Sequence, residues 1–314
     1  MRRFPADSLA LLGALGLLTA VFSLSTNYFL SWTTALALAG QLPEGLLLAT
    51  GMTLVVVTGG IDLSVGSVLA LGAGVFGTAI AVWGVPVPLA MALTLGVGAG
   101  CGLINGLVST RWRVPSFIVT LAMLEMARGA TYLVTESQTR YLGGTVDAIA
   151  APVVAGVRAP FVVALLVAAA GHVLLTRVVF GRQLVAVGAN EDAARLAGVD
   201  PRRVRTTVFV ISGLLAALAA ILQVGRLSAA DPNAGTGLEL EAIAAVVIGG
   251  TSLTGGRGSV ARSALGVLVM AVLGAGLAQL GVQEPTRRLI TGAVIVAAAV
   301  GDALRGARDG RGAA

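Results

Sequence analysis

The chain has 314 residues, of which 56% are hydrophobic and only 11% are charged, and its mean hydropathy is +0.93. Soluble domains carry about a quarter charged residues, so this composition excludes an ordinary soluble domain and indicates a protein that lies in a bilayer. The net charge of +6 comes from arginine alone, because the sequence contains no lysine. Cationic loops that set membrane orientation explain this charge better than binding to nucleic acid does.

Apolar runs of the length needed to cross a hydrocarbon core recur along the chain. Strands of a membrane barrel would alternate polar and apolar residues, so the sequence predicts an all-α polytopic membrane protein with one transmembrane domain over residues 1–314. We expect about ten transmembrane helices, at about 8–24, 36–58, 64–82, 87–108, 117–135, 160–178, 204–226, 240–252, 260–280 and 286–304. The eighth is too short to cross fully, and Pro43 and Glu44 allow a break at the start of the second.

The distribution of arginine predicts the orientation. If the N-terminus lies inside, the inner segments hold most of the 21 arginines, including the group between residues 177 and 205. Positive charge is enriched on the cytoplasmic side, so we expect both termini to lie inside. The charged stretch Met1-Arg2-Arg3 before the first span resembles a signal peptide, but no clear cleavage site follows it, and we interpret this span as a retained helix.

Chemistry-bearing residue types are scarce. Cys101 is the single cysteine and His172 the single histidine, which makes an intrachain disulfide impossible and a metal site unexpected. A phosphate-binding loop of the Gly-x-x-x-x-Gly-Lys type is excluded because there is no lysine. We therefore expect no catalytic residue, no cofactor and no metal, and any energy source must come from another chain.

The stretch 59–67, Gly-Gly-Ile-Asp-Leu-Ser-Val-Gly-Ser, interrupts two long apolar runs with glycines, hydroxyls and a carboxylate. Polar groups inside a membrane protein cost free energy and commonly mark functional sites. Gly59, Gly60, Asp62 and Ser64 therefore either line a transport path or form the start of the third helix. We favour a capping role for Asp62 at the amides around Val65, because the turn lies near the inner face.

Other intramembrane polar residues carry open alternatives. Asn105 either bridges two spans, which we favour, or contacts a substrate. Glu125 and Arg128 have the spacing of an ion pair on one helical face. We expect His172 to be a hydrogen-bonded packing residue rather than a proton carrier, and Glu44 with its neighbour Gln41 marks a possible broken helix near a path.

The inner loop 179–205 carries clear local signals for a short helix. Asn190 is placed to cap it, Glu191 lies in its positive first turn, and Gly198 suits the left-handed position after its end. Asp200 then caps the seventh span, with Pro201 at the first helical position. A helix of about two turns is marginal alone, so it needs a docking surface, either its own membrane domain or a cytosolic partner.

A faint internal similarity links residues 56–64 with residues 247–254: both run from apolar residues through Gly-Gly into a polar turn. Transporters are often built from repeats, but such a pattern also arises by chance in a chain with 43 glycines.

Two motifs carry a resemblance to a known family. The loop pattern Gly188-x-Asn190-x-x-Ala193-Ala194-Arg195-x-x-Gly198 resembles the cytoplasmic coupling loop of bacterial ABC importer permeases. The stretch 51–67, with Gly-Gly-Ile-Asp-Leu-Ser at its centre, resembles the ribose/xylose/arabinose (monosaccharide) branch of the branched-chain amino acid/sugar permease superfamily. Further matches are Asn105-Gly106, the run 114–121, Arg128-Gly129 and the glycine-rich run 249–258.

The resemblance implies a permease subunit in a bacterial plasma membrane. The expected partners are a second permease subunit, identical or paralogous, a cytosolic ABC ATPase, and an extracytoplasmic sugar-binding protein. Two alternatives stay open: an ion-coupled secondary transporter that uses His172, Glu125 and Asp62, or the same machinery carrying a nucleoside or a branched-chain amino acid.

Overall fold

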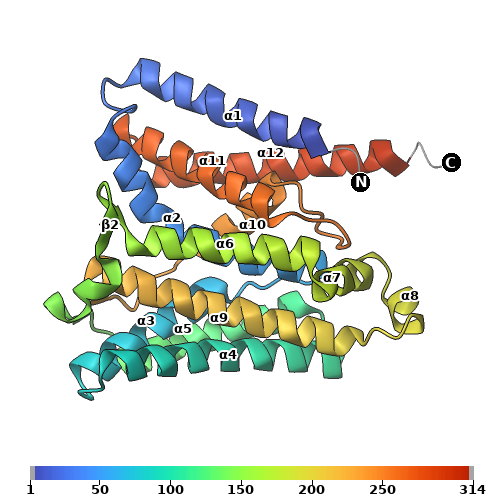
Figure 1. Cartoon of the computed structure of the whole chain (residues 1–314), viewed down its shortest axis with the longest axis horizontal. Helices are drawn as coiled ribbons and strands as arrows, with labels where there is room; N and C mark the ends of the chain where they lie inside the picture. The colour runs from blue at the N-terminus through green and yellow to red at the C-terminus, as the bar shows by residue number, and fades with distance from the viewer. Residues whose placement is uncertain (1–3, 311–314) are drawn as a thin grey trace.

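The computed structural model describes residues 4–310, with side chains placed for residues 8–297 and 300. Arg2, Arg3 and Arg311, which count among the inner arginines of the predicted orientation, lie outside the described residues. Figure 1 shows a bundle of long helices with small β elements at one end and two short helices at the other.

Each of the ten predicted spans is a helix. They are α1 (Phe4–Ser25), α2 (Trp32–Val57), α3 (Val65–Ala81), α4 (Val87–Arg111), α5 (Ser116–Thr135), α6 (Ala159–Arg177), α9 (Pro201–Leu227), α10 (Leu238–Ile248), α11 (Val260–Gln279) and α12 (Glu284–Gly310). Within the described residues, seven of them, α1, α2, α4, α5, α6, α9 and α11, are long and apolar enough to cross a membrane. As expected, α10 is short, with 11 residues. The all-α polytopic prediction is confirmed.

The break expected at the start of the second span is not present, because α2 runs without interruption through Pro43. A proline inside a helix removes one backbone hydrogen bond. Here the helix is held by its packing, since Leu42, Leu46 and Leu47 are all buried in the core. Tertiary burial outweighs the local signal.

The centre of the bundle depends on close backbone packing between α4 and α9. A Cβ atom at Gly98 would collide with the carbonyl oxygen of Gly213, and a Cβ atom at Gly106 would lie 2.7 Å from the Cα atom of Thr206. Small residues at such interfaces let helix backbones approach within a membrane, where van der Waals packing drives association. The 43 glycines of the chain supply many positions for this mode of packing.

The end of the bundle remote from the short helices has a small β structure that the sequence analysis did not predict. Strand β1 (Arg140–Tyr141) pairs antiparallel with β4 (Ala229–Ala230), and β2 (Pro152–Val154) pairs with β3 (Val157–Arg158). The 3₁₀ helix η1 (Gly143–Ala150) lies between β1 and β2. Strands of two or three residues are too short to show an alternating pattern in the sequence.

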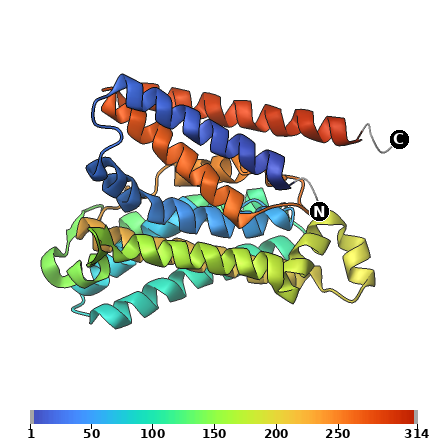
Figure 2. The same cartoon turned by 45° about the horizontal axis from the view of Figure 1, so that its top comes forward.

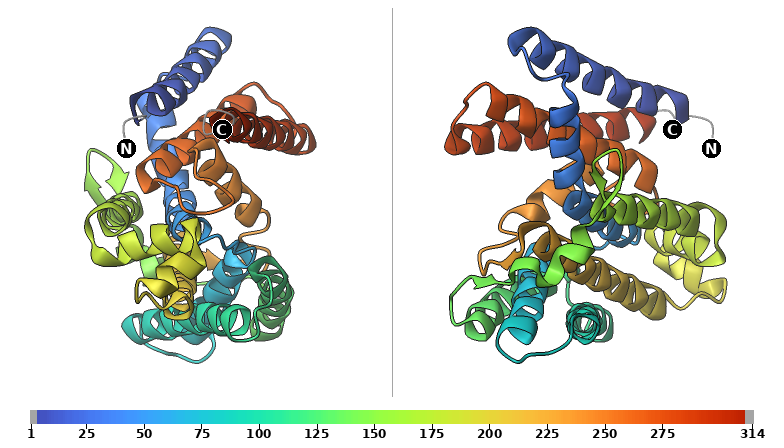
Figure 3. Two further views of the ribbon diagram at one scale, coloured as in Figure 1. Left: turned by 90° about the vertical axis from the view of Figure 1, so that its right-hand side faces the viewer. Right: turned by 60° about the vertical axis from the view of Figure 1, so that its left-hand side comes forward.

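The opposite end has α7 (Val179–Ala189) and α8 (Glu191–Leu196). Figures 1 and 2 show the start of α1 and the end of α12 at this same end of the molecule. A chain that crosses the membrane an even number of times has both ends on the same side, as the predicted orientation requires. In Figure 3, α1 lies at the edge of the bundle, where it packs on α11 through Phe22, Leu273 and Leu277.

Candidate functional site: the α8 region and the α2–α3 turn

The local structure of α8 follows the sequence signals. The side chain of Asn190 accepts a hydrogen bond from the amide of Ala193 at 3.0 Å, as an N-cap does. Gly198 has a φ of 83°, in the left-handed region that favours glycine. Ala194 is buried and anchors the helix, whereas Leu196 is 91% exposed. The short helix is therefore formed by its caps and docked along one edge.

The next helix also starts as predicted. Asp200 accepts from the amide of Arg202 at 3.0 Å, and Pro201 occupies the first position of α9. The helix α7 before α8 was not predicted, because the loop was assigned to begin where the sixth span ends. Leu184 and Val187 of α7 are both buried, and their three-residue spacing was the available signal.

Arg205 of α9 connects α8 to the end of α2. Its Nη1 donates to Glu191 Oε2 at 2.6 Å, and both Nε and Nη2 donate to the carbonyl oxygen of Thr58 at 3.3 Å. Glu191 also pairs with Arg195 at 2.8 Å. Arginine presents several donors in a fixed planar arrangement, so one side chain links three segments. From the sequence, Arg205 counted only among the inner arginines, because its partner Thr58 lies 147 residues away in the chain.

Glycines join the same segments through their backbones. A Cβ atom at Gly188, near the end of α7, would collide with the carbonyl oxygen of Val57. The amide of Gly256 donates to that oxygen at 2.9 Å, and a Cβ atom at Gly255 would lie 2.9 Å from the amide nitrogen of Gly59. The ends of α2 and α7 and the 252–258 loop therefore meet where side chains would not fit.

The two Gly-Gly segments noted in the sequence form similar turns. Gly59 has a φ of 79° and Gly250 a φ of 72°. In each case the following amide donates to the carbonyl five residues earlier, at 3.2 Å and 3.1 Å respectively. This is the hydrogen bond that closes a helix on a left-handed glycine.

A buried polar cluster lies at the α2–α3 turn, residues 58–64. Asp62 Oδ1 accepts from the Ser64 amide at 3.1 Å and from the Ser64 hydroxyl at 2.6 Å, while Oδ2 accepts from the Ser212 hydroxyl of α9 at 2.8 Å. Asn105 of α4 donates to the Ser64 hydroxyl at 3.0 Å. All four residues are about 1% exposed. The cluster joins the turn to α4 and α9.

The expected capping role of Asp62 holds in part. The carboxylate accepts from the amide of Ser64, the residue directly before Val65, and Ser64 itself makes no side-chain cap at the start of α3. The same carboxylate also accepts from the hydroxyls of Ser64 and Ser212, so it joins the turn to α9 as well. Asn105 makes the bridging contact, though its Oδ1 has no partner among the described residues.

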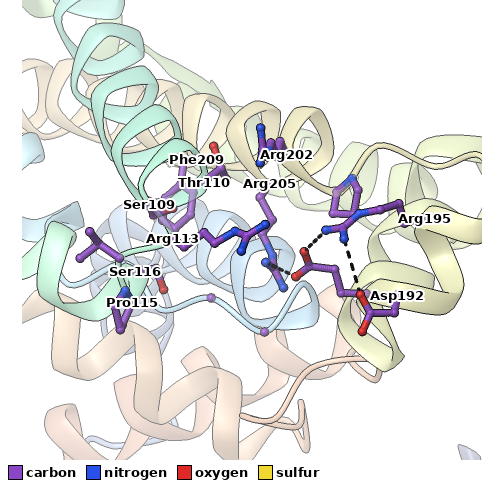
Figure 4. Close-up of a pocket in the computed structure, with 15 residues that line it drawn as sticks. Ser109, Thr110, Arg113, Pro115, Ser116, Asp192, Arg195, Arg202, Arg205 and Phe209 are labelled. Atoms are coloured by element: carbon purple, nitrogen blue, oxygen red, sulfur yellow. Dashed lines mark hydrogen bonds and ion pairs between the residues drawn. The ribbon is translucent and has the colours of Figure 1, made fainter.

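A cavity of about 530 Å³ separates α8 from the α2–α3 turn. Figure 4 shows Arg113, Arg195 and Arg205 reaching toward it from the α4–α5 loop, α8 and α9. Gly59 and Gly60 form part of its wall. Asp62 and Asn105 do not line it. Of the predicted site residues, Gly59, Gly60 and Arg195 line this cavity, whereas Asp62, Ser64 and Asn105 form a buried cluster that does not.

Two further expectations were wrong. Arg128 does not pair with Glu125; it donates to the carbonyls of Pro232 and Ala234 at 3.1 Å and 2.9 Å, and Glu125 is exposed. Backbone carbonyls from a distant loop are better placed than the neighbouring carboxylate. The Nδ1 of His172 is buried without a hydrogen-bond partner among the described residues, so the hydrogen-bonded packing role does not hold.

Comparison with known proteins places this fold and these motifs in one class, the integral-membrane permeases of ABC import systems. Residues 34–299 match the family described as "Branched-chain amino acid transport system / permease component". The chain belongs to this family and is a multi-pass inner-membrane protein. No solved structure matches it.

Among its relatives, the chain is 38% identical to the ribose import permease protein RbsC of Escherichia coli K12, over 93% of this chain and 92% of that one. It is 34% identical to the fructose import permease protein FrcC of Rhizobium meliloti, over 88% and 79% of the two chains. It is 35% identical to the L-arabinose ABC transporter permease protein AraH of Azospirillum brasilense, over 82% and 76%.

Proposed function

We propose that this chain is the permease subunit of an ATP-driven importer of a monosaccharide or a similar polyol. It forms one transmembrane domain over residues 1–314 and pairs with a second permease subunit, identical or paralogous. A separate cytosolic ABC ATPase supplies the energy, and an extracytoplasmic binding protein delivers the sugar. It needs no nucleic acid or cofactor, and its membrane partners are lipids.

The attachment of α8 to the α2–α3 turn is the observation that carries this proposal. Asn190, Ala193, Ala194, Arg195 and Gly198 belong to the capped α8 unit, which has Leu196 exposed, and Gly188 near the end of α7 packs against the carbonyl of Val57. The ion pair of Glu191 with Arg205, and the bonds of Arg205 to Thr58, connect that unit to α2. A displacement of α8 by a cytosolic protein would therefore be transmitted to Gly59 and Gly60, and through them to Asp62, Ser64 and Asn105.

A reconstituted importer tests the function. The chain, its ATPase and its binding protein are placed in liposomes, and uptake of labelled ribose, arabinose, xylose and fructose is followed with and without ATP. We expect uptake of one of these sugars that requires ATP and the binding protein. Uptake by the chain alone under an ion gradient would instead establish a secondary transporter, and uptake of only a nucleoside or branched-chain amino acid would overturn the sugar assignment.

The placement of α8 in the cytosol has its own test. Leu196 is 91% exposed and Ala194 is buried, so Leu196→Cys is the useful labelling position. The native Cys101 is buried and gives a low background. We expect a membrane-impermeant maleimide to label Leu196→Cys in inside-out vesicles but not in intact cells. Labelling in intact cells would show that α8 cannot meet a cytosolic ATPase.

A further inference from the structure

A second cavity, of about 370 Å³, lies among α2, α9, α10, α11 and α12, away from α8. Its polar lining includes Gln41 and Glu44 of α2 and Gln223 and Arg226 of α9. In each pair the residues are three apart, so they share one face of their helix. Glu241 of α10 and Arg287 and Thr291 of α12 also line it, so four helices present charged or polar side chains to one cavity.

Glu44 is the central group. It is 4% exposed, and its Oε1 accepts from Arg226 Nη2 at 2.8 Å and from Arg226 Nε at 3.2 Å. Its Oε2 is buried and has no partner among the described residues. A buried carboxylate oxygen without a donor is costly, and ionisable groups at membrane depth commonly mark substrate pathways. The missing donor therefore points to a ligand in the cavity.

The amides of Gln41 and Gln223 make no hydrogen bond to any described part of the chain, so their donors and acceptors are available. The wall also includes apolar residues such as Leu48, Val267 and Met270. A wall that combines a few polar groups with apolar surface is typical of small-molecule sites, whose volumes are about 300–1,000 Å³.

The charges identify the class of ligand. Two carboxylates, Glu44 and Glu241, and two guanidiniums, Arg226 and Arg287, line the cavity, so the lining has no net charge and favours neither a free anion nor a free cation. A neutral polyol does fit: its hydroxyls donate to Glu44 Oε2 and exchange hydrogen bonds with Arg226 and Gln223, while the C–H face of its ring lies against the apolar wall. Each group left open by the protein is one that a sugar hydroxyl satisfies.

The position along the helices is also informative. Glu44 lies thirteen residues before the end of α2 at Val57, about 20 Å from the α8 end at 1.5 Å per residue. Arg226 is in the last turn of α9, at the end remote from α8. With α8 in the cytosol, the cavity lies toward the extracytoplasmic side, where a delivered sugar enters.

We propose that this cavity is a monosaccharide-binding site within a single permease subunit, in which Glu44 Oε2 and the Gln223 amide contact sugar hydroxyls and Arg226 positions Glu44. This inference rests on the proposed function and goes beyond it by naming the residues that hold the sugar inside the permease.

Gln223→Leu is the informative variant, because it removes the amide, approximately conserves volume and leaves the buried ion pair of Glu44 and Arg226 intact. Gln283→Leu is the matched control, since Gln283 is exposed and outside the cavity. Glu44→Gln is the second variant. It keeps an acceptor but removes the charge that pairs with Arg226, so its folding is checked first by size-exclusion chromatography.

The measurement is binding of the labelled sugar to the purified permease alone in lipid nanodiscs, beside ATP-driven uptake by the complete importer. We expect saturable binding by the wild-type permease. Gln223→Leu should raise the half-saturating sugar concentration about tenfold, the equivalent of one lost hydrogen bond of about 1.4 kcal/mol, and Gln283→Leu should bind as the wild type does.

The outcomes separate the two proposals. If the importer takes up a sugar but the permease alone does not bind it, or Gln223→Leu binds and transports it normally, the cavity is not a sugar site, while the proposed function stands. If the wild-type importer takes up no sugar at all, the proposed function fails and the cavity inference fails with it.

Discussion

The region of α8 and the α2–α3 turn lie next to each other, but α8 is formed by contacts within its own segment and the turn by contacts with distant segments. The shape of α8 comes from residues within ten positions of one another, Asn190, Gly198 and Asp200 among them. The α2–α3 turn depends on Ser212 and Asn105 from other helices and on backbone contacts from Gly188. One region is exposed and capped locally, and the other is buried and assembled from distant segments.

This difference suggests a division of labour in the proposed importer. A locally capped helix keeps its own shape when it is moved, because its hydrogen bonds travel with it. A turn held by several helices changes only when those helices shift together. Arg205 is the polar side-chain link between the two regions, so variants on each side should have distinct effects on folding and on transport.

Gly188→Ala should have the largest effect. The added Cβ collides with the carbonyl oxygen of Val57, and neither backbone can yield without moving α2 or α7, which is a form of overpacking. We expect little folded protein, measured by fluorescence-detected size exclusion of membrane extracts. The control is Gly96→Ala, an exposed α4 position where a Cβ meets nothing within 4 Å. Equal yields for the two variants would contradict the observed junction.

Asp62→Ala should come next. It leaves the hydroxyls of Ser64 and Ser212 without their acceptor inside the core, which costs about 1–3 kcal/mol per unsatisfied group. We expect a lower melting temperature in detergent and weak uptake. Asp62→Asn should be milder, because the amide oxygen still accepts from Ser64. If Asp62→Asn melts normally but does not transport, the carboxylate acts in transport itself.

Arg205→Ala should separate folding from transport. The variant loses the bonds to Glu191 and Thr58 at the partly buried surface, so α8 keeps its caps but is no longer tied to α2. We expect normal insertion and at least a tenfold loss of ATP-driven uptake. Arg203→Ala is the matched control, because Arg203 is 88% exposed and, among the described residues, pairs with Asp200 alone. Comparable uptake by both variants would remove Arg205 from the coupling path.

Asn190→Ala should have the smallest effect of the four. The loss of an N-cap costs about 1 kcal/mol, so α8 should fray and its protection from hydrogen exchange should fall while the rest of the bundle is unchanged. Asn190→Asp retains an acceptor for the amide of Ala193 and should preserve protection. A loss of protection that spreads into α2 would show that the two regions are less independent than their contacts indicate.

Much of the fold was predictable because it follows from composition and local pattern. All ten predicted spans are helices, since a bilayer requires each spanning segment to satisfy its own backbone. The caps at Asn190 and Asp200 were equally predictable from the sequence, because the amides that they accept from lie two or three residues away.

The candidate site was predictable only in part. The sequence identified Asp62, Ser64 and Asn105 as unusual polar residues but not the hydrogen bonds that connect them, and it paired Arg128 with the wrong group. Arg205, Ser212 and the unpaired oxygen of Glu44 carried no signal. Each depends on a partner more than a hundred residues away, or on the lack of one.

The sequence by itself determined that this protein lies in a membrane, where its helices run, and which short segment between α6 and α9 forms a separate capped helix. Only the tertiary structure decided that α2 continues through Pro43, that Asp62 bonds Ser212, and that Glu44 faces a cavity with one oxygen free. The physical reason is range: hydrophobicity and capping act within a few residues, whereas buried polar groups find their partners only after the helices have packed.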